Sequence, residues 1–143
     1  MFNLRGFIYD HLLAHGLPPS LKVIGDHFSW TTSQAREIVA SMKIGKAVVP
    51  HPRTGEIWMA GPFAGHRTTF EVHAGNVTWY ANCAWDVLGV AAIVGRPAHL
   101  RATCGDCGDI LDATVSGTQV EPRDYVAHFL LPAREWYQDL AFT

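Results

Sequence analysis

The sequence has few charged residues and contains no long hydrophobic run. Only 17% of its 143 residues are charged, and the formal net charge is −2. Proteins that bind nucleic acid usually contact phosphates through several clustered basic side chains, so this charge balance disfavours a nucleic-acid partner. A membrane-spanning helix needs about 20 consecutive apolar residues. No such run is present, which predicts that the protein does not cross a membrane.

Cysteine is also scarce, and the start of the chain does not resemble a secretory signal. The first ten residues lack the basic segment followed by an apolar one that marks such a signal. The three cysteines are an odd number, and two of them form a Cys-x-x-Cys. This usage is more typical of reduced, reactive or metal-binding thiols than of a secreted disulfide framework. The sequence therefore predicts a cytoplasmic protein.

Residues 1–62 are predicted to form a winged-helix-like domain that begins with three helices. Apolar residues recur at helical spacing over residues 3–15. Ser20 is placed to cap a second helix. Thr31, followed three residues later by Gln34, matches the capping box of a third helix.

Two short apolar segments, 47–49 and 57–59, flank a turn rich in Pro and Gly and predict the β-hairpin of this domain. In a winged helix, the third helix commonly reads DNA. The exposed positions expected on that helix are Ser33, Gln34, Arg36 and Glu37. Only one of the four is basic, so the pattern disfavours DNA binding.

Residues 63–143 are predicted to form an α/β domain in which a small mixed β-sheet packs on a central helix. The helix corresponds to the apolar run 87–94, ended by Gly95. The expected strands are 68–73, 76–81, 98–103, 110–115 and 125–131, followed by a last helix over 132–140. Helices followed mostly by strands give an α+β fold class.

The start of the central helix is the best candidate for a reactive site. Asn82 is expected to be the N-cap and Cys83 the first helical residue, where the helix dipole favours a thiolate. Asp86 lies three residues later and therefore shares a helix face with the sulfur. A thiol beside a carboxylate suits nucleophilic or soft-metal chemistry with a proton carrier. The alternative is a buried core cysteine with a solvated aspartate.

Three aromatic residues, Trp79, Tyr80 and Trp85, flank this thiol. They could line an apolar pocket for a hydrophobic organic group, or they could be ordinary core aromatics.

In these positions the sequence resembles the alkylmercury lyase family. The resemblance rests on Asn82-Cys83-Ala84-Trp85-Asp86-Val87-Leu88-Gly89, which matches a Cys-x-x-Asp helix start. The preceding segment 59–63 and the later Cys104-Gly-Asp-Cys107-Gly also fit, as does an N-terminal winged-helix-like half.

The resemblance implies cleavage of a carbon–mercury bond by protonolysis. In that family two cysteine thiolates hold the mercury and an aspartate delivers a proton to the departing carbon. Cys83 would then be the first thiolate and Asp86 the proton carrier. The family's second catalytic cysteine has no clear counterpart in this sequence. The implied substrate is a small organomercurial or another small apolar molecule, a soft metal ion is a further candidate ligand, and no cofactor is expected.

The Cys104–Cys107 motif has several interpretations. Its thiols could be structural, could form a redox dithiol, or could supply half of a zinc site. Cys83, His99 and His128 are the spare candidates for the remaining zinc ligands. Alternatively, Cys104 or Cys107 could provide the missing second thiolate to Cys83, because soft thiolates select soft ions. The candidate metal ligands are therefore Cys83, Cys104 and Cys107.

Two other functions stay open at the level of the sequence. One is a family member without lyase activity that uses Cys83 as a nucleophile or soft-metal ligand for another small substrate. The other is a winged-helix regulator that senses metal or redox state through its three cysteines. The sequence does not predict the oligomeric state.

Overall fold

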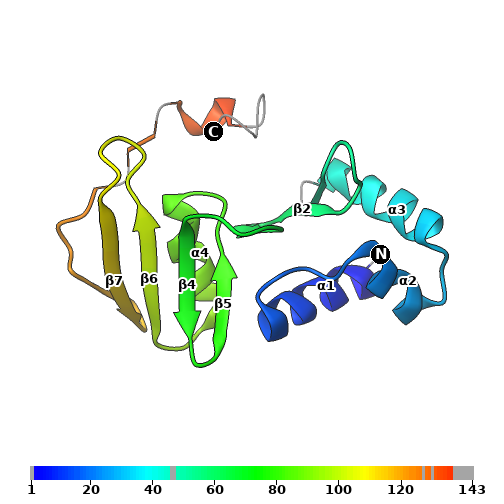
Figure 1. Ribbon diagram of the computed structural model, residues 1–143, viewed down its shortest axis with the longest axis horizontal. Helices are drawn as coiled ribbons and strands as arrows, with labels where there is room; N and C mark the ends of the chain where they lie inside the picture. Colours follow the sequence, from blue (N-terminus) through cyan, green and yellow to red (C-terminus); the bar gives the residue numbers. More distant parts are fainter. Residues whose placement is uncertain (1, 46–47, 127, 130, 137–143) are drawn as a thin grey trace.

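The computed structural model describes residues 2–45, 48–126, 128–129 and 131–136. Three helices come first, followed by a small three-stranded sheet and then a larger five-stranded sheet with one helix against it (Figure 1). The elements are α1 (Phe2–His15), α2 (Leu21–Phe28), α3 (Thr32–Ser41), η1 (Met42–Gly45), β1 (Val49–Pro50), β2 (Ile57–Ala60), β3 (Phe63–Ala64), β4 (Phe70–Ala74), β5 (Val77–Tyr80), α4 (Ala84–Val94), β6 (Ala98–Thr103), β7 (Ile110–Ser116), β8 (Gln119–Glu121) and η2 (Ala133–Glu135).

The first three helices begin where their capping residues predict. The Ser20 side chain accepts a hydrogen bond from the backbone N–H of Val23 at 3.2 Å, which caps α2. Thr31 and Gln34 form the complete capping box at the start of α3. All three predicted helices are confirmed.

The smaller sheet has the order β1-β2-β3, and its strand pairs are antiparallel. The predicted hairpin corresponds to β1 and β2, whereas β3 was not predicted, because a strand of two residues has no readable period. The Arg36 side chain of α3 donates a hydrogen bond to the carbonyl of Thr54 in the β1–β2 loop. The single basic residue expected to face DNA is thus engaged within the protein.

The larger sheet has the order β5-β4-β6-β7-β8, and every neighbouring pair is antiparallel. The prediction of a mixed sheet is therefore wrong. A strand–helix–strand sequence such as β5–α4–β6 often joins parallel neighbours. Here β4 lies between β5 and β6 and pairs with both, so the two strands joined by the helix never pair with each other.

The end of the chain departs most from the prediction. Strand β8 was missed, and the described residues between 125 and 131 are not in a strand. Of the predicted last helix, the structure describes the short 3₁₀ turn η2, and positions 137–140 lie outside the described residues.

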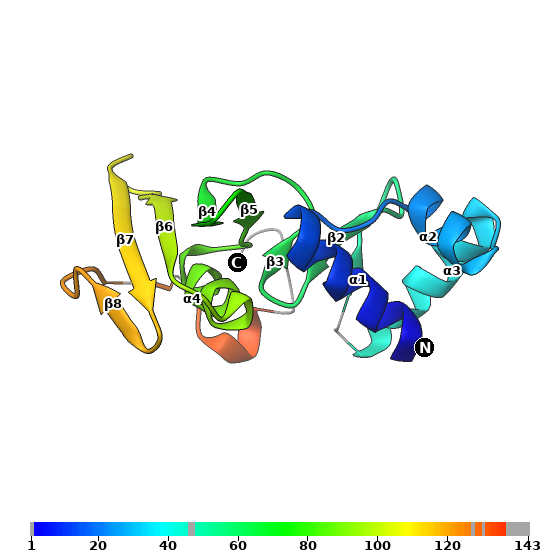
Figure 2. The ribbon, with the colours of Figure 1, turned by 90° about the horizontal axis from the view of Figure 1, so that it is seen from below.

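Helix α4 covers one face of the larger sheet, against β4 and β6 (Figure 2). Val72 and Leu100 on these strands are buried beneath it. The apolar core continues into the N-terminal helices, since α1 packs against β5. At this junction the indole N–H of Trp79 donates to the carbonyl of Leu12 at 2.9 Å. The tight packing also requires Gly16, where a Cβ atom would lie 2.0 Å from the Thr78 carbonyl oxygen.

Within the described part of the chain, no helix combines the length and apolarity required to traverse a lipid bilayer.

Candidate active site at the start of helix α4

Helix α4 begins immediately after β5, and its N-cap is Cys83 rather than Asn82. Cys83 has the extended backbone of a cap residue, with φ −150° and ψ 177°, and Ala84 is the first helical residue. The prediction of Asn82 as the cap is wrong by one position. The reason is a tertiary contact: the backbone N–H of Asn82 donates to the carbonyl of Pro62 at 3.2 Å, which holds this residue against the β2–β3 turn.

The thiol of Cys83 and the carboxyl group of Asp86 are close enough for each to shift the pKa of the other. Burial raises the pKa of the Cys83 thiol, the backbone N–H groups of Asp86 and Trp85 lower it, and the Asp86 carboxylate raises it. The Cys83 side chain makes no capping hydrogen bond to α4. The helix N-terminus therefore lowers the pKa of the thiol by less than burial and the Asp86 carboxylate raise it. Burial also raises the pKa of Asp86, and the hydrogen bonds from Asn82 and Cys83 lower it by less. The pair therefore retains a proton more readily than either group would in water.

Asn82 connects this pair to the N-terminal half of the chain. Its side-chain amide donates to the carbonyl of Gly61 at 2.9 Å and to the Asp86 carboxylate at 3.2 Å. Its side-chain oxygen is buried and has no hydrogen-bond partner among the residues that the structure describes. Sequence reasoning missed this role, because Gly61 lies 21 residues away and no local pattern signals the contact.

An aromatic group lies beside the start of α4. Trp85 is 53% exposed and contacts the ring of Phe129, with centroids 6.1 Å apart. Phe129 in turn contacts Trp136 at 5.0 Å. By contrast, Trp79 is 1% exposed and belongs to the core, and Tyr80 is half-buried. Of the three aromatic residues predicted near the thiol, Trp85 therefore offers the largest accessible surface.

A separate apolar groove of about 320 Å³ lies on the other flank of α4. The helix contributes Ala84, Val87 and Leu88 to its lining, and the rest comes from β6, β7, β8 and residues 122–126. Residues two apart on a helix do not share a face, so Asp86 points away from the face that carries Ala84 and Leu88. Neither Cys83 nor Asp86 is among the residues that line this groove.

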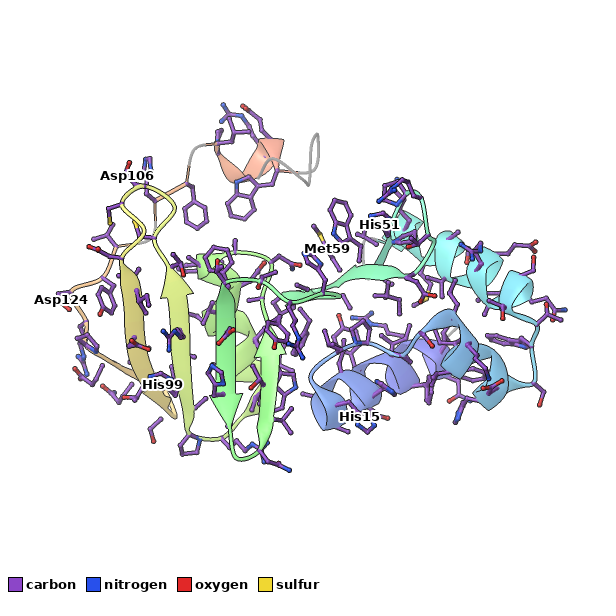
Figure 3. The ribbon with its side chains drawn as sticks, in the orientation of Figure 1. His15, His51, Met59, His99, Asp106 and Asp124 are labelled. Carbon is purple, nitrogen blue, oxygen red and sulfur yellow. The ribbon has the colours of Figure 1, made fainter. Side chains whose placement is uncertain are left out.

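Cys104 and Cys107 lie in the turn between β6 and β7, whose tip carries Asp106 (Figure 3). Cys107 is exposed and Cys104 is partly exposed, and neither forms a disulfide. The backbone N–H groups of Cys107 and Asp106, together with the Cys107 thiol, lower the pKa of Cys104. The backbone N–H of Asp109 lowers the pKa of Cys107, but the Cys104 thiol and the Asp109 carboxylate raise it by more.

The expected zinc ligands do not gather with these thiols. His99 lies on the open face of the sheet, where its Nε2 is 3.3 Å from the Asp112 carboxylate. His128 is exposed. Across the described ranges, no three His, Cys, Asp or Glu residues form a group that could hold a metal ion.

Comparison with known proteins places the sequence in a family. The family model for alkylmercury lyase (MerB) matches residues 63–143. An alkylmercury lyase of Streptomyces lividans is 33% identical over 125 residues, which cover 85% of this chain and 55% of that protein. A nonribosomal peptide synthetase of Aspergillus violaceofuscus is 26% identical over 96 residues, covering 64% of this chain and 1% of the synthetase.

The fold is also similar to that of a solved structure, MerB2. The crystal structure of the mercury-bound form of MerB2 superposes with a TM-score of 0.59 and 16% sequence identity, covering 85% of this chain and 61% of that one. The chain thus spans little more than half the length of the Streptomyces lyase. Because the family model covers more than half of the sequence, the chain belongs to the alkylmercury lyase family.

Proposed function

We propose that this protein cleaves the carbon–mercury bond of small organomercurials, with Cys83 as the mercury-binding thiolate and Asp86 as the proton donor. The proposal rests on one observation above all. The thiol and the carboxyl group lie together at the start of α4, where each shifts the pKa of the other, and the pKa of each is raised. A proton is therefore retained at this pair, where the reaction needs it.

The reaction balances with these two groups. The Cys83 sulfur binds the mercury and displaces its anionic ligand, and the thiol proton passes to the Asp86 carboxylate. Asp86 then donates that proton to the carbon as the carbon–mercury bond breaks, so the bonding electron pair ends in the new C–H bond. The hydrocarbon leaves, and mercury(II) remains on Cys83 with the Asp86 carboxylate beside it as a counter-charge.

Two further contacts support these roles. Asn82 holds the Asp86 carboxylate through its amide, which fixes the donor relative to the sulfur. The exposed ring of Trp85 adjoins the helix start and offers an apolar surface for the organic group. The family membership and the mercury-bound state of MerB2 favour mercury over other soft ions as the substrate atom.

The test is a single-turnover assay with phenylmercury acetate and detection of released benzene. The reduced chain should release benzene. Asp86→Asn should bind the mercurial at Cys83 and release none, because the amide cannot supply the proton. Asp112→Asn removes a carboxylate on the open face of the sheet and should behave as the unmodified protein does. Stoichiometric mercury binding without any hydrocarbon release would instead support a soft-metal-binding relative without lyase activity.

A further inference from the structure

The turn between β6 and β7 holds a pair of thiols that the proposed reaction does not use. Its shape is fixed by backbone hydrogen bonds from Cys104 N–H to the Asp109 carbonyl at 2.8 Å and from Gly108 N–H to the Cys104 carbonyl at 3.0 Å. Gly108 adopts a φ of +77°, which glycine permits at little cost. The two cysteines are therefore presented by an ordered turn of defined geometry.

The turn holds both thiols of the pair. Cys104 and Cys107 are three positions apart in the turn that the Gly108 N–H to Cys104 carbonyl bond closes, and both are accessible to solvent. Asp106 and Asp109 bring negative charge to the same turn, which favours a cation. No third His, Cys, Asp or Glu joins them to complete a metal-binding group among the residues that the structure describes.

Two thiolates without further ligands suit a particular class of ion. Structural zinc needs four ligands. Soft ions that accept two sulfur ligands, such as Hg²⁺ and Cu⁺, need only the pair. We propose that Cys104 and Cys107 form a second, independent binding site for a two-coordinate thiophilic cation, and that in this protein it accepts the mercury(II) left on Cys83. The accepting role rests on the proposed function, whereas the binding site does not.

The sheet brings the two thiol sites to the same end. Phe70 is the first residue of β4. Its carbonyl accepts a hydrogen bond from the backbone N–H of Ala81, and it pairs with Ala102 on β6. Cys83 lies two residues beyond Ala81, and Cys104 lies two residues beyond Ala102. The start of α4 and the β6–β7 turn therefore lie at the same end of the strands of the larger sheet (Figure 1).

Transfer between the sites is balanced and favourable. Mercury(II) leaves the single Cys83 thiolate for two thiolates, the Cys104 and Cys107 protons are released, and Cys83 regains one of them. The second thiolate binds intramolecularly, and the resulting effective concentration strengthens binding by roughly 10²–10⁴-fold over a single thiol. Transfer leaves Cys83 free for another substrate molecule.

The binding site is tested with Hg²⁺ alone in a Cys83→Ser variant of the full chain, in competition with about 1 mM of a monothiol such as 2-mercaptoethanol. We expect one Hg²⁺ per chain, with loss of both titratable thiols. Adding Cys104→Ser or Cys107→Ser should weaken retention by about 100-fold or more. Retention within about tenfold in either single-thiol variant, or one ion bridging two chains, would overturn the proposal.

The accepting role is tested by counting benzene from excess phenylmercury acetate. The unmodified chain should release about two equivalents per chain, because mercury from the first turnover moves to the Cys104–Cys107 pair, whereas Cys104→Ser/Cys107→Ser should release about one. Equal yields from both proteins would refute the transfer. The absence of benzene from both would refute the lyase function, and the Hg²⁺ titration of Cys83→Ser would still decide whether the second site exists.

Discussion

Replacing Trp79 by phenylalanine tests whether the N-terminal helices and the larger sheet share one core. The indole is 1% exposed and donates to the Leu12 carbonyl at 2.9 Å, and the guanidinium of Arg96 lies 5.5 Å from the ring centroid. Strand β5, which carries Trp79, leads directly to Asn82 and Cys83. The junction therefore helps to position the thiol.

The expected cost has three parts. Loss of the hydrogen bond costs about 1 kcal/mol, and no more, because the Leu12 carbonyl also accepts from Gly16 N–H. The smaller ring leaves unfilled volume that costs about 1–2 kcal/mol, less than the 3–5 kcal/mol of full truncation to alanine. Weaker attraction to the Arg96 cation costs about 0.5 kcal/mol. Trp79→Phe should thus lower the free energy of unfolding by about 3 kcal/mol.

Urea unfolding followed by far-ultraviolet circular dichroism measures this change without relying on tryptophan fluorescence. The matched control is Trp85→Phe, since Trp85 is 53% exposed, and its cost should stay near 0.5 kcal/mol. Equal costs for the two variants would show that Trp79 does not join the two halves. Two separate transitions in the unmodified protein would contradict the shared core as well.

Four further predictions concern the site and its support. Asp86→Asn should lower the pKa of the Cys83 thiol, because it removes a negative charge that disfavours the thiolate. In a variant whose other cysteines are serine, the pH dependence of iodoacetamide alkylation should therefore shift to lower pH. An unchanged profile would disprove the coupling between the two groups. Because the pKa of Asp86 is raised in the folded state, its protonated form stabilises the protein. This contribution to the free energy of unfolding is complete below the ordinary carboxyl pKa of 3.8 and is lost as the pH rises through the folded-state pKa. Asp86→Asn should therefore flatten the pH dependence of the urea midpoint across that window. Asn82→Ala should raise the pKa of Asp86 further, because a hydrogen bond to the carboxylate is lost, and a carboxyl titration by NMR that does not move would contradict the contact. Gly16→Ala should destabilise by more than about 1 kcal/mol, because φ is +81° and the new Cβ would meet a carbonyl of β5 at 2.0 Å, whereas Gly105→Ala, with open space around it, should be nearly neutral in the same urea assay.

Local signals were sufficient for most elements. The capping residues Ser20 and Thr31 and the helix-ending Gly95 each act on backbone groups within a few residues, so their effect can be read from the sequence. The Cys83–Asp86 spacing also follows from helix geometry, and in the structure each of these two groups shifts the pKa of the other.

The errors lie where a distant contact outweighs the local preference. Asn82 is a good cap by residue type, but its contacts with Gly61 and Pro62 move the start of α4 by one residue. Likewise, the order of the strands was not readable, because pairing of β4 with both β5 and β6 depends on loop closure and packing.

The sequence by itself determined the helices, most of the strands, and the pairing of a thiol with an acid at one helix start, since these depend on residues a few positions apart. Tertiary structure alone decided that the larger sheet is antiparallel and that Asn82 links Asp86 to the N-terminal half of the chain by hydrogen bonds. It also decided that the Cys104–Cys107 turn lies at the same end of the larger sheet as Cys83. The contacts that decide them, Asn82 with Gly61 and β4 with β6, join residues 21 to 32 positions apart. They form only when burial of the common core offsets the entropy of closing the intervening chain.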